Sequence, residues 1–173
     1  MPLDVASRRN LELTETMREK NKKGSLLSVL DETKTAMGAR TLRKWVEQPL
    51  LSAAEICKRL DAVEELKNDL FLREEIKDIL RTMFDFERIM GRVVYQTANA
   101  RELSMLKNSI ENLPLLKRTL GRCKSTYLQE IYEKLDPLEN IHDLIDQAIV
   151  EDPPFSVREG GMIKHGYSDE LDT

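Results

Sequence analysis

Apolar residues recur every three or four positions along most of the chain. This spacing places apolar side chains on one face of an α-helix, which completes a turn every ~3.6 residues. The first strong segment predicts a short helix near residues 26–30 and a second helix that carries Trp45 and Val46. Pro49 should end the second helix, because proline lacks the amide hydrogen that continues the helical hydrogen bonds.

Residues that favour helix starts mark the segments that follow. Ser52 and Glu55 have the spacing of a capping box and precede an apolar face over residues 56–63. Asn99 and Ser125 each stand before a further periodic segment, and both are residue types that cap helices. These positions predict where three of the later helices begin.

Two prolines fall in the later periodic segments. Pro114 lies inside a long segment that starts after Asn99, and it should kink that helix or divide it in two. Pro137 suits the first turn of a last helix that runs to Ile149. With about eight helical segments in all, the pattern predicts an all-α fold, an irregular multi-helix bundle.

After Ile149 the apolar period changes from helical to alternating. Residues alternate on both sides of Gly160-Gly161, which predicts one short C-terminal β-hairpin with strands near 155–159 and 163–167. Ser168 and the acidic residues after it have the pattern of a further helix start. The pattern alone fits either a hairpin that closes the helical domain or the beginning of a region that this sequence does not contain.

Composition and charge narrow the class of protein. Charged residues make up 34% of the 173 residues and the net charge is −4, which favours a soluble helical protein over a strongly basic nucleic-acid module. The sequence has no apolar run of membrane-spanning length and no signal peptide. We therefore expect a cytoplasmic protein in which Cys57 and Cys123 are reduced.

The search for catalytic or metal-binding chemistry is largely negative. No phosphate-binding loop, dinucleotide fingerprint, zinc-protease motif or EF-hand loop occurs. Glu139, His142 and Asp146 come nearest to a metal site, but one histidine among carboxylates is usual on a solvated helix face. A second carboxylate cluster alternates with basic residues, as charged helix faces do. Its members are Glu74, Glu75 and Asp78.

Basic residues are concentrated near the N-terminus. The segment from Arg18 to Lys23 includes two further lysines and precedes Gly24. Positive charge alone can attract phosphate, but no aromatic residues lie between these lysines to stack on bases. We interpret this segment as a solvated loop.

Several segments nevertheless resemble one family, in order, along nearly the whole chain. They contain R-R-N-L-E-L, L-D-x-T-x-T-x-M-G-x-R-x-L-R-x-W, F-D-F-E-R-I-M-G-R-V, N-A-R-E-L and P-P-x-x-x-R-x-G-G-x-I-x-x-G-Y. Each segment is weak evidence, but together they resemble the MutS mismatch-repair proteins. The resemblance corresponds to the core or lever domain, domain III, of that family.

The resemblance implies a domain division and a role. Residues 1–151 would be the first segment of the helical lever, and residues 152–173 would be the hairpin and first turn leading into an absent clamp domain. The lever would connect mismatch- and DNA-binding regions to the ATPase domain and carry the clamp. This segment would not be an enzyme by itself, and ATP or ADP with Mg²⁺ would serve only the parent protein.

The resemblance also implies partners and structural positions. The partners would be the remaining domains of the parent chain, duplex DNA held by those domains, a MutL-type protein and a second copy of the chain. Pro49 and Pro114 would be pivots between stiff helices. Packing or inter-domain contacts would fall to Arg8, Arg9, Asn10, Arg40 and Trp45. The alternative function is a stand-alone helical adaptor.

Overall fold

The computed structural model describes residues 3–170 and 172, which form ten α-helices and one 3₁₀ turn. This confirms the predicted helical class. None of the described helices is long and apolar enough to cross a membrane. The helices are α1 (Val5–Asn10), α2 (Leu26–Leu30), α3 (Ala36–Glu47), α4 (Ala53–Asn68), α5 (Leu70–Arg81), α6 (Phe86–Val94), α7 (Ala100–Ile110), α8 (Leu113–Leu120), α9 (Thr126–Lys134) and α10 (Glu139–Ala148), with the turn η1 at Val157–Glu159.

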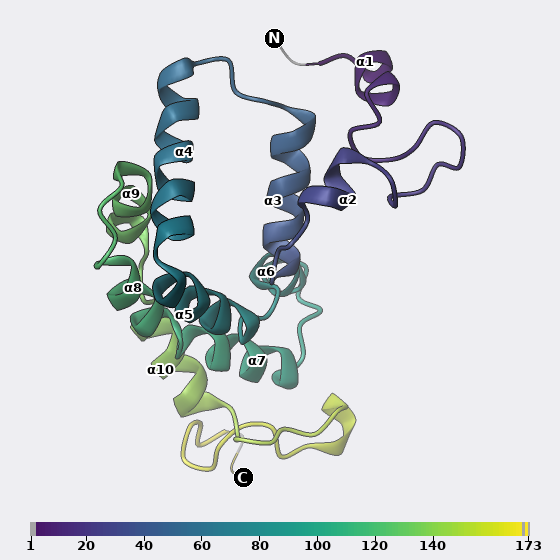
Figure 1. Cartoon of the computed structure of the whole chain (residues 1–173). Coiled ribbons are helices and arrows are strands. Elements are labelled where there is room, and N and C mark those ends of the chain that lie inside the picture. Colours follow the sequence, from purple (N-terminus) through teal and green to yellow (C-terminus); the bar gives the residue numbers. More distant parts are fainter. Residues whose placement is uncertain (1–2, 171, 173) are drawn as a thin grey trace.

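The helices form an open arch (Figure 1). Helices α3 and α4 stand as two pillars joined by the short linker 48–52, with α1 and α2 on the outer side of α3. Helix α4 packs against α5 and α9, α5 packs against α8, and α7 packs against α10. The part from α4 to α10 is therefore a connected body, whereas α3 packs mainly against α2.

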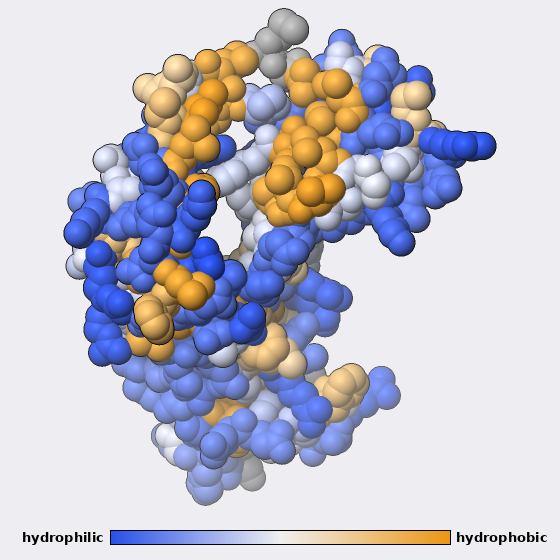
Figure 2. All heavy atoms as spheres, in the orientation of Figure 1, coloured by the Kyte–Doolittle hydropathy of each residue, from blue (hydrophilic) through white to orange (hydrophobic). Residues whose placement is uncertain are grey.

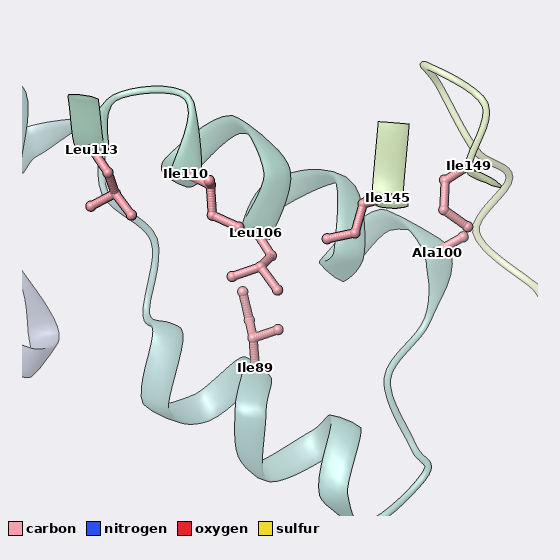
Figure 3. Close-up of a cluster of buried hydrophobic side chains, with 7 residues drawn as sticks. All are labelled: Ile89, Ala100, Leu106, Ile110, Leu113, Ile145 and Ile149. Carbon is pink, nitrogen blue, oxygen red and sulfur yellow. The ribbon is translucent and has the colours of Figure 1, made fainter. Parts of the chain in front are cut away.

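Two apolar cores hold the body together. The first gathers side chains from α6, α7, α10 and the residues that border them (Figure 3). Its buried members are Ile89, Ala100, Leu106, Ile110, Leu113, Ile145 and Ile149. The second core lies among α4, α5, α8 and α9, and its buried members are Ala62, Leu72, Leu120, Cys123 and Leu128. The periodic apolar faces thus converge, because burying them together removes their surface from water.

The N-terminal part has a smaller packed centre of its own. Leu13 and Leu27 are buried there, and the amide of Leu27 donates to the carbonyl of Leu13 at 2.9 Å. Ser25 is also buried; its hydroxyl donates to the Lys22 carbonyl at 2.7 Å and accepts from the Ser28 amide at 3.3 Å. These bonds hold the long loop before α2 against the helix.

Most predicted helix starts are confirmed. Asn99 begins α7 with a full capping box, since its side chain accepts from the Glu102 amide at 2.9 Å and Glu102 accepts from the Asn99 amide at 3.1 Å. Ser52 caps α4 with a single bond to the Glu55 amide. Pro114 lies in the first turn of α8, and the predicted long helix is divided before it, between α7 and α8.

Of two further predicted helix starts, one agrees in position without its capping bond and one differs from the structure. Ser125 occupies the N-cap of α9, but its hydroxyl makes no capping bond. Pro137 lies before α10 instead of in its first turn, because Leu138 adopts a left-handed conformation with φ of 57°. Leu138 is held in this strained conformation by packing against the first core and by donating its amide to Asp136 at 2.9 Å.

The predicted C-terminal β-hairpin is wrong. Among the described residues, 155–159 form no strand, and a 3₁₀ turn begins at Val157. Residues 162–164 instead pair with the end of α10: the Val150 amide donates to the Met162 carbonyl at 3.0 Å, and Ile149 and Ile163 form an isolated antiparallel bridge. This pairing lets Met162 and Ile163 pack against the first core, which an isolated hairpin could not do. The helix start expected after Ser168 is a turn in the part that the structure describes.

Several apolar faces lie on the surface. Figure 2 shows apolar side chains over the upper part of α4 and over α2, on either side of a hollow between the pillars. On α4, Leu60 and Val63 are 57% and 62% exposed, so the predicted apolar face of this helix is not the buried one. The side of α4 that enters the second core carries Ala62 and Leu66.

Candidate functional site

Arg40 links α3 to the start of α6. Its Nη1 and Nη2 donate to the two carboxylate oxygens of Asp85 at 2.9 and 2.6 Å, and its Nε donates to Glu87 Oε2 at 2.7 Å. The hydrogen bonds from Arg40 hold the pKa of Asp85 below its usual value. Asp85 also caps α6 by accepting from the Arg88 amide at 3.2 Å. The paired bonds from Arg40 to both oxygens of Asp85 form the bidentate geometry that arginine favours with carboxylates.

Trp45 makes a second link from α3, to its fellow pillar α4. The guanidinium of Arg59, on α4, lies 3.7 Å from the centroid of the Trp45 ring. Tyr127, on α9, meets Trp45 edge to face with ring centroids 6.5 Å apart, and Arg59 also lies 6.0 Å from the Tyr127 ring. Trp45 belongs to neither of the two body cores, and its ring contacts side chains of α4 and α9 instead.

The basic residues of α1 are separated by the fold. Arg8 donates from Nε to the Leu3 carbonyl at 3.0 Å and lies 3.9 Å from Glu47 at the end of α3. Arg9 and Asn10 are exposed at the C-terminal end of α1. The structure therefore brings Arg8 to α3, which also carries Arg40 and Trp45. Inter-domain roles for these residues stay predictions.

The two prolines lie at non-helical joints. Pro49 is exposed within the linker between α3 and α4. Pro114 follows the break at residues 111–112, where the α7 helix ends and Asn112 starts α8 without a side-chain capping bond. Short joints between stiff helices are places where a hinge can absorb dihedral change.

We predict that Pro114→Ala alters communication through the domain. Alanine restores an amide and removes the constraint on φ, so the joint between α7 and α8 gains freedom. The measurement is the change in DNA affinity on nucleotide binding in a full-length MutS protein that carries this segment. Thr126→Ala, at the exposed start of α9, is the control. Coupling equal to that of the unchanged protein would remove the pivot assignment.

An apolar groove that the sequence did not reveal lies between α6, α7 and α10. Its volume is about 500 Å³ and every lining residue is apolar. Met90, Val93 and Leu144 in its lining are 47%, 37% and 53% exposed. The apolar spacing on α6 and α10 was visible in the sequence. Only the fold shows that the two apolar faces lie near each other and leave a groove between them. Such a groove fits an apolar partner surface.

The candidate metal ligands are not brought together. His142 contacts Asp143 and Glu111 at 3.0 and 3.3 Å, whereas Asp146 pairs with Lys107 at 2.9 Å. The hydrogen bond to Asp143, then that to Glu111, raises the pKa of His142. No three metal-ligating side chains among the described residues are placed to hold one ion.

The carboxylates of α5 point to separate partners. Glu74 pairs with Lys77 at 2.7 Å, and Asp78 pairs with Arg81. Glu75 accepts from the Thr119 hydroxyl at 2.9 Å and from Arg122 at 2.6 Å, and the Thr119 bond is the first cause of its lowered pKa. These contacts agree with a charged helix face that also ties α5 to α8.

The basic N-terminal segment is exposed along residues 17–24. Within this segment, Lys22 pairs with Asp31 at the end of α2, with 2.5 Å between Lys22 Nζ and Asp31 Oδ2. That hydrogen bond lowers the pKa of Asp31 to about 2. One lysine of the segment therefore secures the loop, as expected of a solvated loop with local ion pairs.

Comparison with known proteins gives the family. Residues 6–172 match the family described as MutS domain III. The chain is 52% identical over 172 residues, 99% of its length, to the DNA mismatch repair protein MutS of Ruminiclostridium cellulolyticum. It is 51% identical over all 173 residues to the protein of that name from Lachnoclostridium phytofermentans. The chain spans about a fifth of the length of these relatives, 20% and 19%. Because the family match covers nearly every residue, this chain belongs to the MutS domain III family.

Proposed function

We propose that this chain acts as the structural lever of a MutS-type DNA mismatch repair protein. The lever connects DNA-binding regions to an ATPase domain and carries the DNA clamp. The observation that carries the proposal is the family match across residues 6–172. The open helical arch supports it, because its two cores make α4–α10 a body that can move as a unit.

The architecture suits the transmission of displacement. Each helix is stiff along its axis because its backbone hydrogen bonds are internal. The cores fix the angles between helices of the body, while the joints at 48–52 and 111–112 interrupt the helices. A lever needs both properties: rigid segments to carry motion and few joints to direct it.

Partners and cofactors are assigned to the rest of a longer protein. The 173-residue sequence contains no phosphate-binding loop for ATP or ADP with Mg²⁺, so nucleotide chemistry falls to another domain. Duplex DNA would be held by the clamp and mismatch-binding domains, and a MutL-type protein would bind the assembled molecule. The apolar groove supports contacts with further parts of the chain or with a second copy.

A DNA titration tests this function. We expect this chain alone to bind a matched duplex weakly or not at all, with equal affinity for a duplex containing one mismatch. The net charge of −4 and the paired basic residues account for this expectation. Fluorescence anisotropy at low and at high salt is the measurement. Full-length MutS with the same two duplexes is the positive control. Tight binding that prefers the mismatch would overturn the lever role.

A further inference from the structure

Helix α3 is attached to the body differently from the other long helices. It contains no buried residue, whereas each helix from α4 to α10 contributes at least one. Neither body core includes a described residue from α1, α2 or α3. We call residues 5–47, α1 to α3, the N-terminal arm. The arm is joined to the body by the linker 48–52 and shares no core with it.

The face of α3 that looks toward the body borders a cavity. The cavity has a volume of about 580 Å³ and is lined on this side by Arg40, Thr41, Lys44, Trp45 and Gln48. These positions recur at helical spacing and therefore form one stripe of α3 and its C-cap. All of these residues except Trp45 are exposed, so the stripe makes few van der Waals contacts with the body. Moving the arm would therefore break few dispersion contacts along it.

Among the described residues, an ion-pair network and an aromatic contact span the gap, and their chemistry differs. The ionic latch consists of Arg40 with Asp85 and Glu87. The stacking latch consists of Trp45 with Arg59 and Tyr127. Both latches start from α3 and end on the body, on α6 and its cap and on α4 with α9 respectively.

We propose that the N-terminal arm swings as a unit about the linker 48–52, and that the ionic and stacking latches hold it in the position seen here. The arm stays intact in this motion because α2 and the preceding loop pack within it. This swing rests on the lever function proposed above, but its test measures only a distance between two helices of this chain.

The two latches respond differently to salt. The side chains of Arg40 and Glu87 are 47% and 64% exposed and that of Asp85 is 21% exposed, so dissolved ions reach the ionic latch and weaken it. The stacking latch depends mainly on contact between an aromatic face and a planar guanidinium. High salt should therefore loosen the ionic latch first and leave the arm held by Trp45.

A distance measurement by pulsed electron paramagnetic resonance tests the proposal. One spin label goes on Cys57, which is exposed on α4, and the other on Val29→Cys, at a position that is 75% exposed on α2. Cys123 is buried, and burial raises the pKa of its thiol, so it reacts slowly with the label. With both latches present we expect one narrow distance distribution.

The latch variants should change this distribution in a defined order. Arg40→Gln with Trp45→Ala should broaden it and shift it to longer distances, and each single variant should have a smaller effect. Asp85→Asn removes the charge of Asp85 but keeps an oxygen that can cap α6. It should change the distribution less than Arg40→Gln, because Glu87 still accepts from Arg40. For the Trp45→Ala chain, raising the salt to about 1 M should reproduce the double variant.

The control variant distinguishes loss of the ionic latch from loss of any positive charge on α3. Arg43→Gln removes a charge from the same helix, but Arg43 pairs with Glu47 within α3 at 2.9 Å. It should leave the distance distribution unchanged. Circular dichroism should show equal helix content in all variants, since no substituted residue belongs to a core. An unchanged distribution in the double variant, or equal broadening by Arg43→Gln, would overturn the proposal. Neither result would bear on the DNA titration.

Discussion

Replacing Ile110 with alanine is expected to lower the free energy of unfolding by about 2–5 kcal/mol. Ile110 is 2% exposed and lies where α7 meets the residues of α6 and α10 (Figure 3). Alanine loses the transfer free energy of the removed methyl and methylene groups and leaves a cavity that its neighbours cannot fully close. The effect should be large because this core joins three helices.

Urea unfolding followed by circular dichroism measures the loss. Ile131→Ala is the matched control, because Ile131 is 38% exposed on α9 and belongs to neither buried core. It should cost clearly less than Ile110→Ala. Equal losses at the two positions would show that the first core does not hold the body together.

Replacing Glu65 with alanine is expected to cost about 1.5–3 kcal/mol, the usual range for hydrogen bonds to a charged group. Glu65 lies on α4, and its two carboxylate oxygens accept from the amides of Lys124 and Ser125 at 2.6 and 2.8 Å. Ser125 is the N-cap residue of α9 and makes no side-chain cap of its own, so the two bonds to Glu65 hold the start of α9 against α4. The substitution removes both bonds and with them this tie between two helices.

The contribution of Glu65 should depend on pH. Burial acts to raise its pKa, but the hydrogen bonds from Ser125 and Lys124 outweigh burial, and the pKa lies below the ordinary 4.5. A carboxyl whose pKa is lower in the folded state stabilises the fold above its unfolded pKa. That stabilisation is lost as the pH falls through the folded pKa. The difference between the unchanged chain and Glu65→Ala should therefore be full at pH 7 and shrink below about pH 4.5.

Urea unfolding at neutral and acidic pH checks this prediction. Glu64→Ala, at the exposed neighbouring position, is the control and should change stability little at either pH. A Glu65→Ala loss that is the same at pH 7 and at pH 3 would show that the charge of Glu65 does not contribute.

Local signals in the sequence predicted helix ends well where the capping group is a neighbour. Asn99 and Ser52 start helices because the side chain reaches an amide three residues away. The start of α9 differs because it is held by Glu65 of another helix, which accepts from the amides of Lys124 and Ser125 just before the helix. Pro137 was misplaced because the left-handed Leu138 is stabilised by packing and not by local preference.

The C-terminal segment also combines a local signal, which the sequence shows, with a long-range contact, which it does not. Its glycines adopt the left-handed conformation that glycine favours, with φ of 70° at Gly160 and 67° at Gly161, but they form no hairpin turn. The pattern could not choose the pairing partner. Residues 162–164 pair with the end of α10 because that position also buries Met162 and Ile163 on the first core.

The sequence by itself determined the helical class, most helix positions and the family, because periodicity, caps and motif order are local properties of the chain. Tertiary structure alone decided which apolar faces are buried: Ala62 enters a core, while Leu60 and Val63 on the same helix stay exposed. It also decided that Arg40 and Trp45 join the arm to the body. Burial and long-range pairing depend on which distant elements contact each other. Periodicity describes only neighbouring residues, so it does not specify those contacts.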